Sequence, residues 1–153
     1  MKTVLIAVDD SKGSEAPVRA FLNLFSCMRP ESVLLLYVEK IEGRSLMDEM
    51  LGVAELSTLK EQLHGSEYQA ALDRKAQTVL EYYAKMLRGQ GVPGIKTVVR
   101  EGHPSDEILE AAKEAGAEMI IIGSRGQRLH TLLIGSVSRE VSNRAEIPVL
   151  IAR

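Results

Sequence analysis

Two short segments of the sequence carry residue types that could hold a phosphate group. The first is Asp9-Asp10-Ser11, which follows an apolar run, and the second runs from Gly123 to Ser138 as GSRGQRLHTLLIGSVS. Glycines permit the left-handed backbone angles that turn successive N–H groups toward an anion. Gly135 and Ser136 then open a predicted helix, whose unpaired N–H groups and positive dipole end favour a phosphate. On these features alone, phosphate binding and ordinary turns both remain open.

Side chains of the second segment could strengthen such a site. The hydroxyls of Ser136 and Ser138 can donate hydrogen bonds to phosphate oxygens, and Arg125 and Arg128 could supply positive charge. The segment therefore offers backbone donors, hydroxyl donors and cations within a short stretch of chain.

Patterns typical of other site classes are missing from the sequence. There is no Gly-x-x-x-x-Gly-Lys-Ser/Thr loop and no Gly-x-Ser-x-Gly elbow. The 3 histidines, His64, His103 and His130, share no metal-ligand spacing on one helix. We therefore assign no catalytic residue and no set of metal ligands, and we expect a binding protein rather than a fast enzyme.

Five short runs rich in Val, Ile and Leu must position the two segments. They are Val4–Val8, Val33–Val38, Ile95–Val99, Met119–Ile122 and Val149–Ala152. Several are continuously apolar, as in parallel strands covered on both faces. The fold class predicted is α/β: a single doubly wound open sheet of five parallel strands with helices on both faces. Ligands of such sheets collect beyond the carboxyl ends of the strands where the topology reverses, and there the two segments should meet.

Four helices are expected between the strands. Ser14 could cap a helix that runs through Phe25, and a stripe of apolar residues predicts a long helix ending near Gly89. Ser105 could cap a third helix, and a fourth runs from about Ser136 to Arg144.

Residues 39–66 do not fit this alternation of strands and helices. Their apolar residues could line one or two short amphipathic helices packed on the domain, or a mobile lid or protein-partner surface. The chain is otherwise expected to be one domain over residues 1–153, since its length suits a single core.

Composition excludes several classes of protein. The 19 Lys and Arg against 21 Asp and Glu give a net charge of −2, which disfavours nucleic acid as the partner. An apolar content of 45% with 26% charged residues is typical of a globular domain. No apolar run approaches the length that spans a bilayer or the core of a signal peptide, so we expect a cytoplasmic protein without membrane insertion.

The single cysteine, Cys27, lies in an apolar stretch and is expected to be buried.

The sequence resembles the universal stress protein family over its whole length. The opening Val4–Ser11, the segment Glu101-Gly102-His103-Pro104 and the ending Gly135–Ile151 are similar to the family's first strand, its turn before the third helix and its close. Nucleotide-binding members carry Gly-x-x-Gly, nine residues, then Gly followed by Ser or Thr. Here eight residues, Gln127–Ile134, separate Gly126 from Gly135, one fewer than in the family pattern.

The resemblance implies a Rossmann-like fold, similar to adenine nucleotide alpha hydrolases, and a regulatory module that binds ATP or another adenine nucleotide, with Mg²⁺ or Mn²⁺ beside a triphosphate. Slow ATP hydrolysis is compatible with it. The alternatives are a nucleotide-free dimeric scaffold of the same fold and an adenylate-transferring enzyme. Matching positions imply a contact between Asp9 and the ribose or base, although Asp9 could also be a turn former. The nucleotide-binding residues implied are Ala7, Val8, Asp9, Val38, Gly123, Arg125, Gly126, Gly135, Ser136, Val137 and Ser138.

The last strand predicts self-association. Pro148–Ala152 is apolar and chain-terminal, so it is expected to lie at an edge of the sheet, where an unprotected strand invites pairing with another chain. Many family members dimerise through this strand, so the resemblance also implies a homodimer. The alternative is a monomer in which residues 39–66 cover this edge of the sheet.

Overall fold

The computed structural model describes residues 1–40, 67–124 and 134–153 of the chain. Its centre is one sheet of five parallel strands in the order β3-β2-β1-β4-β5. The strands are β1 (Thr3–Val8), β2 (Ser32–Lys40), β3 (Ile95–Gly102), β4 (Met119–Gly123) and β5 (Val149–Ala152). Each of the five predicted apolar runs is therefore a strand, and the predicted fold class is confirmed.

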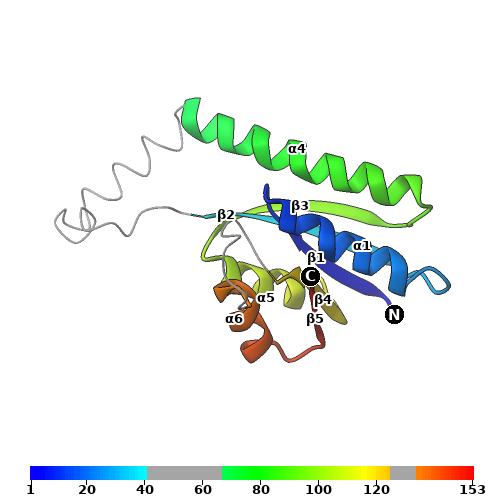
Figure 1. The fold of residues 1–153 in the computed structure, drawn as a ribbon. Coiled ribbons are helices and arrows are strands. Elements are labelled where there is room, and N and C mark those ends of the chain that lie inside the picture. Colours follow the sequence, from blue (N-terminus) through cyan, green and yellow to red (C-terminus); the bar gives the residue numbers. More distant parts are fainter. Residues whose placement is uncertain (41–66, 125–133) are drawn as a thin grey trace.

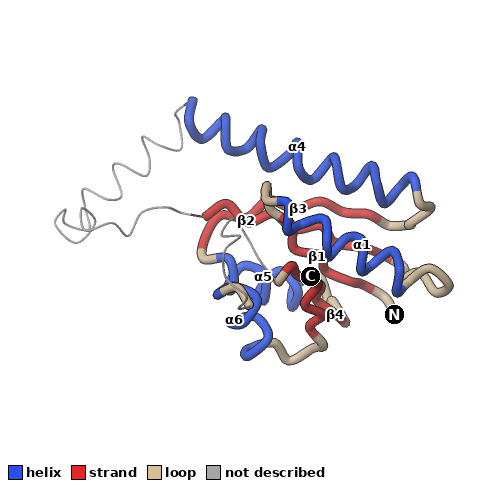
Figure 2. The backbone as a smooth tube through the Cα atoms, viewed as in Figure 1, coloured by secondary structure: helices blue, strands red, loops and turns tan. Residues whose placement is uncertain are grey.

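Helices cover both faces of the sheet. Helices α1 (Glu15–Leu24) and α4 (Glu67–Gly89) lie on one face, and α5 (Pro104–Glu114) and α6 (Ser136–Arg144) lie on the other (Figure 1). A short 3-10 helix, η1 (Lys12–Ser14), leads into α1. In Figure 2 the strands run between these two pairs of helices. Since the chain crosses over on one face before β3 and on the other face after it, the topology reverses between β1 and β4.

Side chains of the central strands alternate between two apolar clusters. Val4, Ile6 and Val8 of β1 face α1 and α4, whereas Leu5 faces α5 and α6 with Ala7 at its margin. Both faces of β1 are thus buried, which explains why its sequence is continuously apolar. The same alternation holds along β2, where Tyr37 lies in the first cluster and Val38 borders the second.

Two predicted helix caps are wrong, although the helices themselves are present. Ser14 stands at the N-terminus of α1 but already has helical angles (φ −76°, ψ −13°), and its hydroxyl makes no cap. Helix α5 begins earlier than predicted, with Pro104 in its first turn and His103 as the extended residue before it. Ser105 therefore lies inside α5, where its hydroxyl contacts His103 Nδ1 at 2.8 Å.

The predicted burial of Cys27 is also wrong, because this thiol is exposed. Helix α1 ends at Leu24, and of the apolar residues that follow only Phe25 packs partly against the core. Met28 is 82% exposed. The excursion predicted at 39–66 begins later than expected, because β2 continues through Lys40. The rest of that excursion, 41–66, lies outside the described residues.

Candidate functional site

The two segments singled out in the sequence meet at the reversal of topology. β1 and β4 are hydrogen-bonded neighbours, with Ala7 opposite Ile122 in the parallel register. Asp9 directly follows β1, and Ser124 directly follows β4. Because parallel strands end at the same edge, Asp9 and Ser124 lie at neighbouring strand ends, as predicted.

Asp9 is the centre of a tight turn after β1. Its Oδ1 accepts hydrogen bonds from the Ser11 N–H at 2.9 Å, the Ser11 hydroxyl at 2.5 Å and the Ser14 hydroxyl at 2.7 Å. The Asp9 N–H in turn donates to Ser14 Oγ at 2.6 Å. All the side-chain hydrogen bonds that the described residues give Asp9 end on Oδ1. The carboxylate is thereby held in one orientation, and Oδ2 takes part in none of these hydrogen bonds.

On the other side of the reversal, a backbone clasp joins the end of β4 to the start of α6. The Ser124 N–H donates to the Ala152 carbonyl at 2.7 Å, and the Gly135 N–H donates to the Ser124 carbonyl at 2.7 Å. Ser124 is buried. These two bonds hold Gly135 beside the end of β4, so the first turn of α6 begins at the carboxyl edge of the sheet.

The first turn of α6 presents donors to that edge. The N–H groups of Ser136, Val137 and Ser138 have no acceptor within an α-helix, and the positive end of the helix dipole lies there. Ser136 is exposed, whereas the Ser138 hydroxyl is buried and donates to the Gly135 carbonyl at 3.0 Å. Ser138 therefore stabilises the helix start with its hydroxyl, and its backbone N–H is the group available to an anion.

The apolar residues among the implied nucleotide-binding positions divide between the two faces of the sheet; the resemblance implies that Ala7 and Val38 line the adenine pocket and that Val137 belongs to the phosphate cradle. Ala7, Val38 and Val137 all border the cluster beneath α5 and α6, which is the face on which α6 begins. Val8 instead lies in the cluster beneath α1 and α4. Successive strand residues point to opposite faces, so Ala7 and Val8 cannot line one pocket with their side chains. Only the backbone of Val8 could serve a ligand on the α6 side.

Part of the predicted phosphate loop is not described. Gly123 is the last residue of β4, opposite Ala152. Arg125, Gly126, Arg128 and His130 lie outside the described residues, so their predicted contacts remain predictions.

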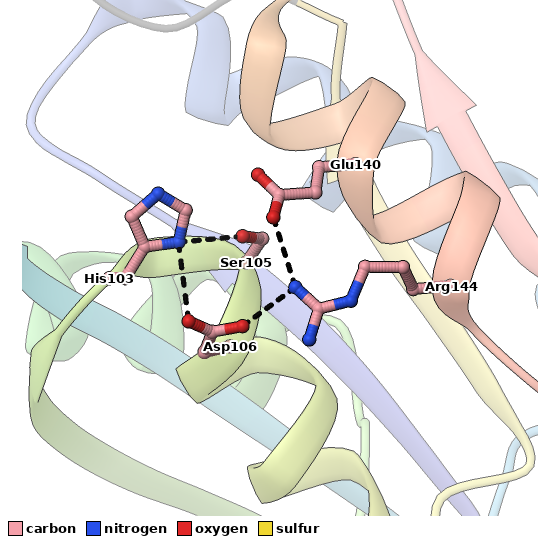
Figure 3. Close-up of polar contacts among 5 residues, drawn as sticks. All are labelled: His103, Ser105, Asp106, Glu140 and Arg144. Carbon is pink, nitrogen blue, oxygen red and sulfur yellow. Dashed lines mark hydrogen bonds and ion pairs between the residues drawn. The ribbon is translucent and has the colours of Figure 1, made fainter.

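A cluster of charged side chains ties α6 to α5 (Figure 3). Arg144 Nη1 donates to Asp106 Oδ1 at 2.6 Å and to Glu140 Oε1 at 2.9 Å, while His103 Nδ1 lies 3.5 Å from Asp106 Oδ2. Such exposed ion pairs contribute about 0–1 kcal/mol each to stability. They join the last turn of α6 to the first turn of α5.

A shallow hollow of about 230 Å³ lies nearby on the opposite face. Its lining is Asp9, Asp10, Ser11, Thr78, Val79, Tyr82 and Tyr83. It includes none of the predicted apolar residues and no part of α6. Burial, with a smaller contribution from Glu15, raises the pKa of Tyr83 to about 12, so this phenol is neutral at physiological pH.

Sequence reasoning missed two groupings at the same edge. Asp10, which from sequence was interpreted as a solvated residue near the site, forms an ion pair with Lys75 of α4. Glu39, Asp73 and Glu101 bring three carboxylates together, although they are far apart in sequence. The signal for the second grouping was the strand register, because Glu39 and Glu101 are partners in the β2–β3 pair.

In the part of the chain that the structure describes, no helix has the length and apolar character needed to cross a membrane.

Relatives of known family can be aligned with this chain over nearly its whole length. The chain matches the Universal stress protein family (Usp) over residues 1–153. It is 30% identical over 156 residues to universal stress protein MJ0577 of Methanocaldococcus jannaschii, covering 99% of this chain and 94% of that protein. It is also 30% identical over 152 residues to universal stress protein YxiE of Bacillus subtilis, covering 98% and 97%.

Solved structures share the fold. That of hypothetical protein MJ0577 superposes with a TM-score of 0.77 at 27% identity, covering 99% of this chain and 94% of that chain. A universal stress protein in complex with cAMP has a TM-score of 0.62 at 20% identity, with 99% and 96% covered. The universal stress protein from Archaeoglobus fulgidus in complex with dAMP has a TM-score of 0.59 at 22% identity, with 100% and 98% covered. By the match over its full length and by its relatives, this chain belongs to the universal stress protein family.

Proposed function

We propose that this protein binds an adenine nucleotide, with ATP as the first candidate, at the carboxyl ends of β1 and β4. In this proposal the protein acts as a regulatory module in a stress response. One observation carries the proposal: a pre-oriented carboxylate and a helix N-terminus face the same reversal of topology. Asp9 Oδ2 would accept a hydrogen bond from a ribose hydroxyl or from the base. The N–H groups at the start of α6 would donate to the phosphates.

The base would lie on the α5 and α6 face. Ala7, Val38 and Val137 border one apolar cluster on that face, and an adenine ring favours such surroundings. Gly123, Arg125 and Gly126 would complete the phosphate contacts from the loop after β4. Mg²⁺ or Mn²⁺ would accompany a triphosphate, held mainly by the phosphate oxygens.

The relatives support adenine as the recognised base. The two solved complexes described above contain cAMP and dAMP, which have in common an adenine and a phosphate. The proteins that bind those ligands are 20% and 22% identical to this chain, so what they have in common with it is the fold.

Native mass spectrometry and calorimetry test the proposal. Protein purified without added ligand should release an adenine nucleotide, and stripped protein should bind ATP. Gly126→Val should weaken that binding by obstructing the glycine turn. Gly89→Val is the matched control, because a Cβ at Gly89 meets nothing within 4 Å. Equal ATP affinity in all three proteins would contradict the placement, and triphosphate affinity unchanged by EDTA would exclude the accompanying cation.

A nucleotide-free scaffold is the second candidate. Its support is the loop of eight residues between Gly126 and Gly135, together with β5, which is the last strand in the sheet order. Val149, Leu150 and Ile151 of β5 are only partly buried. A homodimer paired through β5 would be the assembled form under either candidate. Absence of bound nucleotide in native protein, with no heat on ATP addition, would favour the scaffold.

An enzymatic role would need a separate observation. Among the described residues we assign none to catalysis. Hydrolysis of ATP well above that of Gly126→Val would be required to propose one.

A further inference from the structure

The hollow between α4 and the turn after β1 lies on the face of the sheet opposite the proposed nucleotide pocket. Pockets that enclose a whole small molecule have volumes of about 300–1,000 Å³. This hollow is shallow and has about 230 Å³, so it suits a single side chain rather than a nucleotide. It has two walls: Asp9, Asp10 and Ser11 of the turn, and Thr78, Val79, Tyr82 and Tyr83 of α4.

The α4 wall of the hollow is aromatic. The rings of Tyr82 and Tyr83 meet edge to face, with centroids 5.1 Å apart and planes at 77°. Tyr83 is only 6% exposed, whereas Tyr82 is 56% exposed. Tyr83 therefore belongs to the inner side of the hollow, and Tyr82 stands at its rim with ring surface in contact with solvent. Tyrosine is one of the residue types enriched in protein–protein interfaces.

The opposite wall of the hollow carries negative charge. Asp10 forms an ion pair with Lys75, so these two charges offset each other. Asp9 accepts its hydrogen bonds from neutral groups, which are the N–H and hydroxyl of Ser11 and the hydroxyl of Ser14. Within residues 1–40, 67–124 and 134–153, no ion pair involves Asp9. The charge of Asp9 is therefore the one that a cation in the hollow would balance.

The phenol of Tyr83 responds to the same negative charge. Burial raises its pKa most, and the carboxylates of Glu15 and Asp9 raise it further. A carboxylate has this effect because it opposes the formation of a second negative charge nearby. The same carboxylates favour a positive charge beside the ring.

An aromatic wall opposite a carboxylate wall suits an organic cation. The face of a tyrosine ring attracts a positive charge, and a carboxylate accepts charge-assisted hydrogen bonds from it. A guanidinium fits this pair better than an ammonium, because it is planar, weakly hydrated and able to stack on a ring while it donates to a carboxylate. Arginine and tyrosine are also among the residues that contribute most to binding in protein interfaces.

We propose that the hollow is a docking site for an arginine side chain of a partner protein, with the guanidinium held between the Tyr82 ring and the Asp9 carboxylate. The volume of the hollow admits one such side chain, and the charge of Asp9 selects a cation. Although Asp9 borders both the hollow and the proposed nucleotide site, the α4 wall belongs to the hollow alone. Docking of arginine therefore does not require a bound nucleotide.

An NMR titration of the nucleotide-free, full-length protein with short capped peptides tests this site. The probe is Gly-Gly-Arg-Gly-Gly, and the same peptide with citrulline or leucine in place of arginine supplies a neutral side chain of the same shape or an apolar one. The arginine peptide should shift the signals of Thr78, Tyr82 and Tyr83 with a Kd of about 1–10 mM, as expected for one side chain. The citrulline and leucine peptides should bind at least about tenfold more weakly, because neither has a charge.

Substitutions at the rim separate the ring from the charge. Tyr82→Leu should weaken binding of the arginine peptide about threefold to thirtyfold, whereas Tyr82→Phe keeps the ring and should bind as the unmodified protein does. Thr78→Lys should abolish binding, because it places a positive charge in the hollow. Gln77→Lys is its matched control, since Gln77 is exposed on α4 and lies outside the lining.

Four results would overturn the proposal. They are unchanged signals at about 50 mM arginine peptide, equal binding of the citrulline or leucine peptide, equal binding by Tyr82→Leu, and loss of binding in Gln77→Lys as large as in Thr78→Lys. Shifts of the same signals on raising the protein concentration without peptide would assign the hollow to a second copy of this chain and would overturn it equally. Circular dichroism of every variant shows that it is folded.

Discussion

Replacing Asp9 by asparagine and by alanine separates the two roles given to its carboxylate. Oδ1 accepts three hydrogen bonds that build the turn, and Oδ2 is the oxygen proposed to bind the ligand. Asparagine keeps an oxygen at the first position and removes the charge at the second. Alanine removes both. The two variants should therefore differ in stability, and both should lose nucleotide affinity.

The magnitudes follow from the bonds. Each hydrogen bond contributes about 0.5–1.5 kcal/mol, and water replaces part of it at a half-exposed site, so Asp9→Ala should lose about 2 kcal/mol. That corresponds to a melting temperature lower by about 4–8 °C in a domain of this size. Asp9→Asn should lose less than about 1 kcal/mol and yet bind ATP about tenfold more weakly, since a charge-assisted hydrogen bond to the nucleotide becomes a neutral one.

Urea unfolding and ATP titration calorimetry on the same preparations measure both effects. A loss of stability as large in Asp9→Asn as in Asp9→Ala would refute the role of Oδ1 in the turn. ATP affinity unchanged in Asp9→Asn would refute the role of Oδ2.

Three further predictions concern other parts of the molecule. The pKa of Tyr83 is raised to about 12 in the fold, so the unfolded chain loses this proton at lower pH than the folded chain does. The free energy of unfolding should therefore fall as pH rises from about 10 to about 12. In urea unfolding, Tyr83→Phe should show a smaller fall over this pH range. The raised pKa of Glu39 makes its charge unfavourable in the fold, so Glu39→Gln should unfold at higher urea than the unmodified protein at pH about 7 in EDTA, and the gain should vanish below pH about 4. Lower stability of Glu39→Gln at neutral pH would contradict this sign. Leu150→Lys should place a positive charge on β5 of both protomers of the proposed dimer and shift sedimentation toward the monomer, whereas Leu150→Met should remain dimeric. An unmodified protein that sediments as a monomer at high concentration would refute the dimer paired through β5.

The sheet could be predicted from sequence because a strand buried on both faces has a continuous run of apolar residues. Val4–Val8 and Val33–Val38 are continuously apolar, and each lies within the strand predicted. Helix α6 has the predicted bounds, since Gly135 precedes it and its last turn ends at Arg144. The meeting of Asp9 with the segment after β4 followed from parallel topology alone.

Features that depend on tertiary geometry could not be predicted in the same way. Ser14 has the residue type of a helix cap, but a preceding 3-10 turn gives it helical angles, so its hydroxyl goes to Asp9. Burial of Cys27 would have required an element to cover the turn after α1. The pairing of Glu39 with Glu101 depends on the register of strands that are distant in sequence. An apolar pattern predicts which face of a strand is buried, but it does not predict which charged residues at the strand ends become neighbours.

The most direct test of the nucleotide site is residue-specific NMR of the stripped, isotope-labelled protein during ATP addition. The account predicts that the backbone N–H signals of Val137 and Ser138 shift on binding, and that the methyl groups of Ala7 and Val38 show cross-relaxation with the adenine protons. Signals of Thr78 and Tyr82, which line the hollow on the opposite face, should stay in place. Shifts confined to that hollow, or an unchanged spectrum at saturating ATP, would contradict the site at the ends of β1 and β4.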